Sequence, residues 1–143
     1  RLMSRGLGDV YKRQDAPCSS TGTIRKNPDI LIRNNIIDLT KLQRIQQELL
    51  KNAASNIKVG GYLMYIVCSL EEEEGEDIVN KFLKTNTNFQ ILNLNQYIQD
   101  LKKTLKLNTI GYLKFLPNDF KVHQNDHLNG NNGFFSAIIE RKF

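Results

Sequence analysis

Two cysteines, Cys18 and Cys68, are the side chains of this 143-residue sequence best suited to covalent chemistry. A cysteine thiolate is a strong nucleophile, although an ordinary thiol titrates at about pH 8.5 and needs a neighbouring dipole or cation to ionise. The two cysteines form no Cys-x-x-Cys motif, so the sequence predicts neither a metal site nor a disulfide framework. We therefore expect free thiols in a reducing compartment.

Cys68 follows an uncharged apolar run that begins at Gly60-Gly61 and ends at Val67. A run of this length, introduced by two glycines, predicts a strand that is buried on both faces. Such strands are typical of the interior of a mostly parallel sheet. Because parallel α/β sheets hold their functional groups at the carboxyl ends of the strands, Cys68 is the first candidate catalytic residue.

Cys18 lies in a different setting, the segment 15–22 (DAPCSSTG), which combines an acid, a proline, a thiol and three hydroxyls. Pro17 fixes its own backbone and biases Ala16 towards an extended conformation, which predicts a shaped loop. A turn with an incidental cysteine is an equal alternative at this point, because turns collect these residue types.

The chain is mildly basic, with a formal net charge of +5 and a pI of about 9.3. Residues 1–14 show neither strand alternation nor a helical stripe, and we expect a disordered lead-in or a foreign junction. Arg25 and Lys26 could contact phosphates, with a solvated pair as the alternative. This charge is compatible with an RNA partner without requiring one.

Two amphipathic helices are predicted. The first begins at Asp38 or Thr40, with a capping box at Thr40, and its apolar stripe continues to Ile57. The second is predicted to begin at residues 69–72, which match a capping box. Residues 71–74, all glutamates, are interpreted as a solvated first turn that favours the positive end of the helix dipole.

Strands and loops complete an α/β pattern. Strands are predicted over residues 89–94, 111–116 and 134–140, a short helix over 97–105, and a polar loop over 118–132 that contains His123 and His127. Because adjacent parallel strands end at the same edge of a sheet, we expect Cys18 and Cys68 to face a single cleft. No apolar run reaches the roughly 20 residues that a membrane span requires.

These motifs resemble those of one family. The stretch 15–29 (DAPCSSTGTIRKNPD), the glutamine-containing helix and the stretch 60–70 (GGYLMYIVCSL) are similar to the Sun (Fmu) family of bacterial S-adenosylmethionine-dependent RNA cytosine-5 methyltransferases. The ending from Pro117 to the Asn-Gly-Phe-Phe motif at 132–135 is also similar. The resemblance covers residues 15–143. It implies the C-terminal half of a Rossmann-like class I methyltransferase domain, with a mostly parallel sheet and an antiparallel closing strand.

The resemblance also implies a chemical role for several residues. Carbon 5 of cytosine is not nucleophilic enough to accept a methyl group unaided, and a thiolate that adds to carbon 6 activates it. The resemblance gives this attack to Cys68 and the release of the methylated product to Cys18. Asp15 would contact ring nitrogen 3 and lie at the edge of the cofactor site. The expected substrate contacts are Pro17, Ser19, Arg25 and Lys26.

The partners follow from the same resemblance. It implies S-adenosylmethionine as the cofactor and RNA, ribosomal RNA first, as the macromolecular partner. We expect no metal, no DNA partner and no membrane, and a monomer in the cytoplasm.

The sequence departs from the family pattern near the site. Ser20 stands where the family usually has Gly, Val67 where it has Thr or Ser, and Gly75 where it often has Asn. Upstream of Asp15 no glycine-rich cofactor loop is present. We therefore expect residues 15–143 to be a partial catalytic domain that lacks the cofactor-binding half and is inactive alone.

Two alternatives are left open by the sequence. One is a non-catalytic RNA-binding remnant, and the other is a thiol protein that uses Cys18 and Cys68 as a redox pair. The absence of a Cys-x-x-Cys motif makes the redox pair the weakest of the three.

Overall fold

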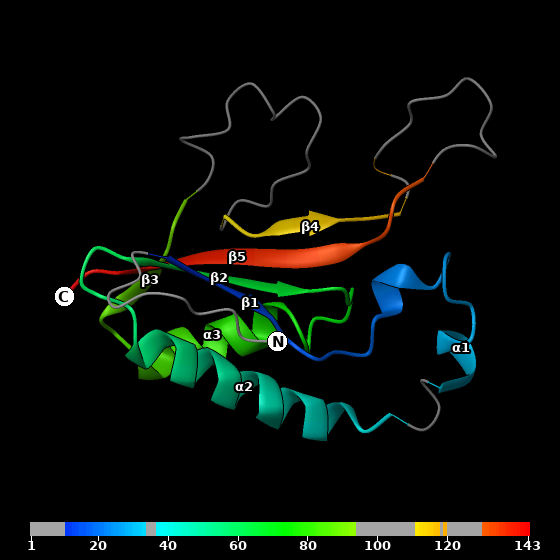
Figure 1. Ribbon diagram of the computed structural model, residues 1–143, viewed down its shortest axis with the longest axis horizontal. Helices are drawn as coiled ribbons and strands as arrows, with labels where there is room; N and C mark the ends of the chain where they lie inside the picture. The colour runs from blue at the N-terminus through cyan, green and yellow to red at the C-terminus, as the bar shows by residue number, and fades with distance from the viewer. Residues whose placement is uncertain (1–10, 34–36, 94–110, 118, 120–129) are drawn as a thin grey trace.

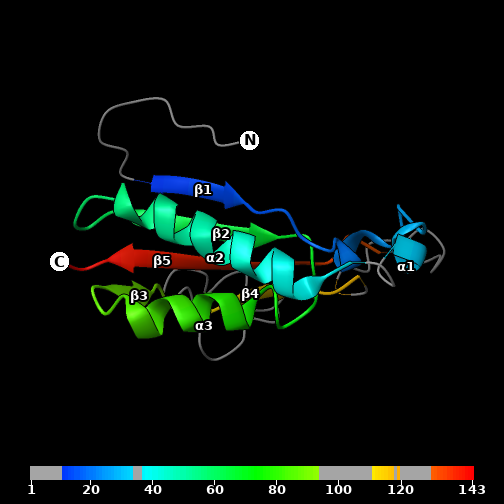
Figure 2. The ribbon, with the colours of Figure 1, turned by 90° about the horizontal axis from the view of Figure 1, so that it is seen from below.

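The computed structural model describes residues 11–33, 37–93, 111–117, 119 and 130–143. The elements are β1 (Tyr11–Asp15), the 3-10 turn η1 (Thr21–Thr23), α1 (Ile30–Arg33), α2 (Leu39–Ser55), β2 (Tyr62–Val67), α3 (Glu76–Thr85), β3 (Phe89–Ile91), β4 (Leu113–Phe115) and β5 (Phe134–Arg141). The strands form one β-sheet, and the helices α2 and α3 cover one of its faces (Figures 1 and 2). Within these residues no helix has both the length and the apolar character to cross a membrane.

The sheet has the strand order β1-β2-β5-β3, and β4 also pairs with β5. Strand β1 is parallel to β2, whereas β2, β3 and β4 are each antiparallel to β5. The predicted α/β class and the antiparallel last strand are therefore confirmed. The mostly parallel sheet is not confirmed, because β5 lies between β2 and β3 and makes three of the four described strand pairs antiparallel.

Strand β2 confirms the strand predicted between the two glycines and Cys68, but only one of its faces is buried. Leu63, Tyr65 and Val67 are at most 1% exposed, whereas the alternate residues are partly exposed. Side chains of a strand alternate between the two faces, so the buried set faces the helices and the other set faces away. The prediction of burial on both faces is wrong for this reason.

The core fills the space between the sheet and the helices α2 and α3 (Figure 2). The ring of Phe135 in β5 lies at its centre, with its centroid 6.4 Å from that of Tyr65 and 5.3 Å from that of Tyr112. Other buried members are Leu50, Ala53, Ile78, Val79, Phe82, Ala137 and Ile139. The apolar stripes that predicted the two helices therefore supply the core, as amphipathic helices do.

Both capping-box predictions are wrong, although one of the two predicted starts of the first helix is confirmed. Asp38, not Thr40, caps α2, since its carboxylate accepts a hydrogen bond of 3.1 Å from the Lys41 amide. Helix α3 begins at Glu76 rather than within residues 69–72. Residues 71–75 form a separate turn ahead of it, with Gly75 as the cap residue. The glutamates of this turn are therefore not the first turn of the helix.

The first described strand overturns part of the expectation for residues 1–14. Tyr11 to Gln14 belong to β1, whose register runs from Tyr11 opposite Tyr62 to Asp15 opposite Ile66. Its backbone pairs with β2 although its sequence is polar, so pairing with a central strand outweighs the missing apolar pattern. The predicted helix at 97–105 and both histidines lie outside the described residues.

Ile139 offers a test of β5 as the central strand of the sheet, because it is fully buried between β2 and β3. We expect Ile139→Ala to lower the free energy of unfolding by about 2–5 kcal/mol, through lost burial and the cavity left behind. The control Val59→Ala, at a side chain 61% exposed, should change it by less than about 0.5 kcal/mol. Urea unfolding monitored by circular dichroism measures both, and equal losses would contradict this arrangement.

Candidate active site

A cavity of about 960 Å³ lies at the carboxyl ends of β1 and β2, on the face of the sheet that the helices do not cover. Met64 and Ile66 of β2 form its floor, and Leu113 and Phe115 of β4 form part of its wall. Met64 and Ile66 are partly exposed because they face this cavity, which explains why β2 is buried on only one face. The cavity is large enough to hold a small organic ligand.

Both cysteines line this cavity. Cys68 follows β2 directly and is exposed, whereas Cys18 follows the end of β1 by three residues and is partly buried. Both are free thiols. The prediction that Cys18 and Cys68 face a single cleft is confirmed.

Two glycines hold the loops of this cavity in close contact. The Gly22 amide donates to the carbonyl of Cys68 at 3.1 Å, and the Gly133 amide donates to the carbonyl of Gly22 at 2.6 Å. A Cβ added to Gly22 would lie only 2.0 Å from the Gly133 carbonyl oxygen. The Cys18 loop, the Cys68 loop and the chain entering β5 therefore meet at a point where only backbone fits.

A buried carboxylate, Glu74, joins the Cys18 loop to the Cys68 loop beneath the cavity. Glu74 is fully buried, and Ser19 donates to its carboxylate through its backbone amide, at 3.0 and 3.2 Å, and through its hydroxyl. The Gln46 side-chain amide of α2 donates to Oε1 at 2.9 Å. The Tyr65 hydroxyl donates to the Glu74 carbonyl at 2.7 Å. The interpretation of residues 71–74 as solvated glutamates is therefore wrong for Glu74.

Gln46 is oriented by the acceptors around it. Its Nε2 donates both to Glu74 and to the carbonyl of Pro17, each at 2.9 Å, while its buried Oε1 has no partner among the described residues. An unpaired buried acceptor costs about 1–3 kcal/mol. The Gln46 amide nevertheless keeps this orientation, because a flipped amide would place its oxygen against the Glu74 carboxylate and the Pro17 carbonyl. Glu74 and Pro17 together therefore set the orientation of the Gln46 amide.

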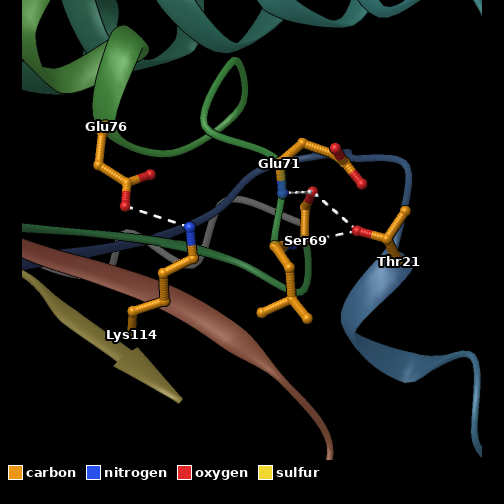
Figure 3. Close-up of polar contacts among 6 residues, drawn as sticks. Thr21, Ser69, Glu71, Glu76 and Lys114 are labelled. Carbon is orange, nitrogen blue, oxygen red and sulfur yellow. Dashed lines mark hydrogen bonds and ion pairs between the residues drawn. The ribbon is translucent and has the colours of Figure 1, made fainter. Parts of the chain in front are cut away.

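A second polar cluster lies between the two cysteine loops (Figure 3). The Ser69 hydroxyl lies 3.2 Å from that of Thr21 and accepts a hydrogen bond of 3.1 Å from the Glu71 amide. Thr21 also accepts from the Leu70 amide at 3.0 Å. Ser69 therefore caps the turn that follows Cys68 rather than the helix α3.

An ion pair joins the N-terminal end of helix α3 to β4. Lys114 Nζ lies 3.2 Å from Glu76 Oε1, in a partly buried position (Figure 3). This contact fixes β4, which carries Leu113 and Phe115 of the cavity wall, against the first turn of α3.

The Cys18 thiol is in a setting that favours its neutral form. Burial raises the pKa of Cys18 above its ordinary value of 9.0, and the negative charge of Glu74 raises it further. Hydrogen bonds from the backbone and hydroxyl of Ser20 and from the backbone of Cys68 act in the opposite direction without cancelling the rise. Cys18 is therefore a thiol at neutral pH.

The remaining predicted site residues occupy different positions. Pro17 lines the cavity, as its proposed place beside a base requires. Ser19 is only 2% exposed and its hydroxyl is bonded to Glu74 and Ser69, so it supports the site from below and does not face the cavity. Arg25 and Lys26 are exposed and do not line the cavity, and Arg25 donates to the carbonyl of Gly130 at 3.1 Å.

Asp15 is the last residue of β1, and its backbone is paired with Ile66 at the floor of the cavity. Its expected contact with ring nitrogen 3 of a base stays a prediction.

The positions that depart from the family pattern have structural explanations. Ser20 has φ 63°, in the left-handed region that glycine adopts at least cost. Val67 is buried on the helix-facing side of β2, so its side chain points away from the cavity. A Cβ on Gly75 would lie 2.9 Å from the Phe135 ring, which explains why a side chain is not accommodated here.

Several residues of the site carried no signal that the sequence analysis used. Glu74 is one of four consecutive glutamates, and Gln46 lies on a helix whose apolar stripe dominates the pattern. Phe115 and Phe134 stack in the cavity wall with ring centroids 4.4 Å apart. Asn132 also lines the cavity, and its buried Oδ1 has no partner among the described residues.

The described side chains form no evident site for a metal or for a nucleoside cofactor. No three His, Cys, Asp or Glu side chains among them come together as ligands would. The polar side chains that line the cavity belong to Cys18, Ser20, Cys68 and Asn132, and none is acidic. Since an acidic side chain commonly holds the ribose of such cofactors, these described residues do not fit the adenosine of S-adenosylmethionine.

Comparison with known proteins identifies the family of this chain. The model of the 16S rRNA methyltransferase RsmB/F family matches residues 12–140. The chain belongs to this family. Its membership confirms the resemblance to the Sun (Fmu) proteins and identifies the fold as one used by RNA methyltransferases.

Two relatives and one solved structure illustrate the similarity of this RsmB/F family chain to known proteins. The ribosomal RNA small subunit methyltransferase B of Thermus thermophilus is 42% identical over 76 residues, which are 53% of this chain and 19% of that protein. The tRNA (cytosine(34)-C(5))-methyltransferase of Drosophila melanogaster is 40% identical over 70 residues, 49% of this chain and 9% of that protein. The crystal structure of PH0851 aligns with a TM-score of 0.72 and 30% identity, covering 92% of this chain and 26% of that chain.

The contact between Gly22 and Gly133 can be tested by adding one methyl group. We expect Gly22→Ala to cost about 1–3 kcal/mol of unfolding free energy and to change the alkylation rates of Cys18 and Cys68, because the loops must separate. The control Gly60→Ala meets no atom within 4 Å, so its positive φ of 77° should lower stability without changing either rate. Unchanged cysteine reactivity in Gly22→Ala would contradict the packing described.

The raised pKa of Cys18 predicts that stability declines in alkaline solution. A pKa higher in the folded than in the unfolded chain means that the unfolded chain binds fewer protons above about pH 9, so the free energy of unfolding falls as pH rises. Burial raises the pKa of Tyr65 in the same direction. Urea unfolding between about pH 7 and pH 11 should show this decline. The Cys18→Ala variant should show a shallower decline, and an identical slope would refute the assignment.

Proposed function

We propose that this chain is the substrate-activating part of an RNA cytosine-5 methyltransferase that acts on ribosomal RNA. The observation that carries the proposal is the placement of Cys18 and Cys68 at neighbouring strand ends in one cavity. Membership of the RsmB/F family and the relative named for cytosine C5 methylation support the same reaction. S-adenosylmethionine would supply the methyl group, held by parts of the full-length protein beyond the residues described.

Cys68 is the proposed nucleophile. Its thiolate adds to carbon 6 of cytosine, forming a C–S bond and moving the ring electrons so that carbon 5 becomes nucleophilic. Asp15, at the end of β1, is proposed to contact ring nitrogen 3 and so to limit the negative charge that builds up there. Cys68 is the exposed cysteine of the pair, which supports its assignment to the step that must reach an incoming base.

Cys18 is proposed to assist product release. After methylation, carbon 5 gives its proton to a solvent water that acts as the base, and the electrons of that C–H bond restore the ring double bond. The bond between carbon 6 and the Cys68 sulfur then breaks, with its electron pair left on the sulfur. The Cys18 loop is tied to Cys68 through the hydrogen bond from Gly22 to the Cys68 carbonyl, which keeps the two groups at the same cavity. The methylated base and a free Cys68 thiolate result.

The wall of the cavity suits a nucleobase taken out of a stack. The stacked rings of Phe115 and Phe134 offer an aromatic surface beside the cysteines, and base–aromatic stacking contributes about 1–3 kcal/mol per base. Cytosines in loops and single strands present their faces and edges readily, whereas a paired cytosine must first be rotated out of the helix. Unpaired RNA is therefore the proposed substrate.

The same proposal covers the contacts with the RNA, the type of nucleic acid and the place where the protein acts. Pro17 shapes the cavity wall beside the base, and Lys26, which is exposed, is available for an RNA phosphate. We propose RNA rather than DNA as the partner, and a cytoplasmic monomer. Lys26 would act by charge alone, so its contribution should weaken as salt is raised.

The decisive experiment uses RNA that contains 5-fluorocytosine. Fluorine at carbon 5 cannot leave as a proton does, so methylation traps the protein on the RNA through the bond to carbon 6. We expect the full-length protein with S-adenosylmethionine to form a covalent complex that resists denaturing electrophoresis, and Cys68→Ala to form none. A complex that persists in Cys68→Ala would overturn the assignment.

Cys18→Ala is the matched variant for the release step. With ordinary cytosine in the RNA, it should accumulate a covalent complex that wild type does not, because attack proceeds while release is slowed. If Cys18→Ala instead turns over at the wild-type rate, Cys18 has no part in release.

A further inference from the structure

We propose that Glu74 is a positioning residue that gives the two-cysteine site a single nucleophile, by anchoring the Cys18 loop and keeping Cys18 protonated while Cys68 attacks. The roles of attack and release rest on the proposed function. The effect of Glu74 on Cys18 rests on the structure alone. None of the residues that bind Glu74 contacts the substrate in this proposal, so Glu74 acts through Cys18.

The first support is mechanical. Ser19 is the residue next to Cys18, and its amide and hydroxyl both donate to the Glu74 carboxylate. Gln46 adds a donor to the same carboxylate and a second to Pro17, on the other side of Cys18. Cys18 is therefore flanked by two residues that are fixed through one buried group. The Tyr65 hydroxyl of β2 donates to the Glu74 carbonyl, which ties the turn that contains Glu74 to the sheet.

The second support is electrostatic. The partners of the Glu74 carboxylate are neutral donors, and the two described ion pairs, Arg33 with Asp29 and Lys114 with Glu76, do not include it. A buried negative charge that no described cation neutralises acts strongly on its neighbours, because the interior screens it poorly. The groups that face Cys18 among the described residues are Glu74, Tyr65, Ser20 and the backbone of Cys68.

These groups act on Cys18 in a definite direction. Burial is the largest cause of its raised pKa, and Glu74 adds to it, while Ser20 and the Cys68 backbone oppose the rise. Tyr65 stays neutral, since burial, Glu74 and Cys18 all raise its pKa. Glu74 is thus the one fixed charge among these described groups that disfavours a Cys18 thiolate.

The consequence for the reaction is a division of roles between two chemically identical side chains. A site with two thiolates could attack carbon 6 from either, and an adduct through Cys18 would leave no group in place for release. With Cys18 held as a thiol, Cys68 attacks alone.

The test is the pH dependence of Cys18 alkylation by iodoacetamide, followed by mass spectrometry on this chain in a Cys68→Ala background. The midpoint of the profile reports the thiol pKa, and the high-pH plateau reports accessibility. Glu74→Gln preserves the shape of the side chain and removes its charge. We expect its midpoint to fall, so that alkylation at a fixed pH below the midpoint is about threefold faster.

Gln46→Met is the matched control. It removes the donors to Glu74 and Pro17 and keeps the charge. A looser loop also exposes Cys18, and burial is the largest cause of its raised pKa, so Gln46→Met should raise the plateau and lower the midpoint less than Glu74→Gln does. If Glu74→Gln leaves the midpoint unchanged, or if Gln46→Met lowers it equally, Glu74 has only a structural role and the inference is overturned. Circular dichroism establishes that each variant is folded.

The wild-type sequence supplies a second measurement that needs no change at Glu74. The Cys18 midpoint in the folded Cys68→Ala chain must lie above that of the same chain in urea. The reverse order would refute the inference even if Glu74→Gln does not fold. Because no RNA is used, failure here leaves the 5-fluorocytosine experiment untouched, and failure of that experiment leaves the thiol titration valid.

Discussion

The site depends on one buried carboxylate whose hydrogen bonds come from different parts of the chain. Burying a charged group is costly unless hydrogen bonds replace its lost hydration, and Glu74 receives donors from the Cys18 loop and from α2. Because the donors Ser19 and Gln46 are themselves buried, none can move without leaving another polar group unpaired. The requirement to satisfy this carboxylate therefore fixes the distance between the two cysteine loops more firmly than apolar contact would.

The sheet creates the cavity that the cysteines share. The helices α2 and α3 cover one face, so β2 presents Met64 and Ile66 on the other face to whatever binds there. Strand β5 runs against β2 and brings β4 over that face, with Phe115 and Phe134 stacked at the rim. The apolar surface left open at the carboxyl ends of the strands is the place where α/β sheets bind ligands.

Much of the framework could be predicted from local sequence, because the helical stripes and the apolar run before Cys68 are patterns of neighbouring residues. The shared cleft of Cys18 and Cys68 followed from strand polarity. Three features could not be predicted. The pairing of the polar strand β1 is decided by β2, and the insertion of β5 between β2 and β3 depends on long-range contacts. The burial of Glu74 depends on donors 28 and 55 residues away, and nothing in a run of four glutamates distinguishes the one that faces inward.

Strand β5 also has a consequence for the order in which this chain can fold. It is the last described strand, yet it pairs with β2, β3 and β4, so the described sheet cannot be completed until β5 is available. Pairings between segments so far apart in sequence are slow to form, because a long loop must close before any contact rewards it. On a ribosome the helices and the β1–β2 pair can form early, while the far wall of the cavity must wait. The two cysteine loops can therefore meet early, when β1 pairs with β2, and the cavity around them closes only when β5 has paired and has brought Phe134 and β4 into its wall.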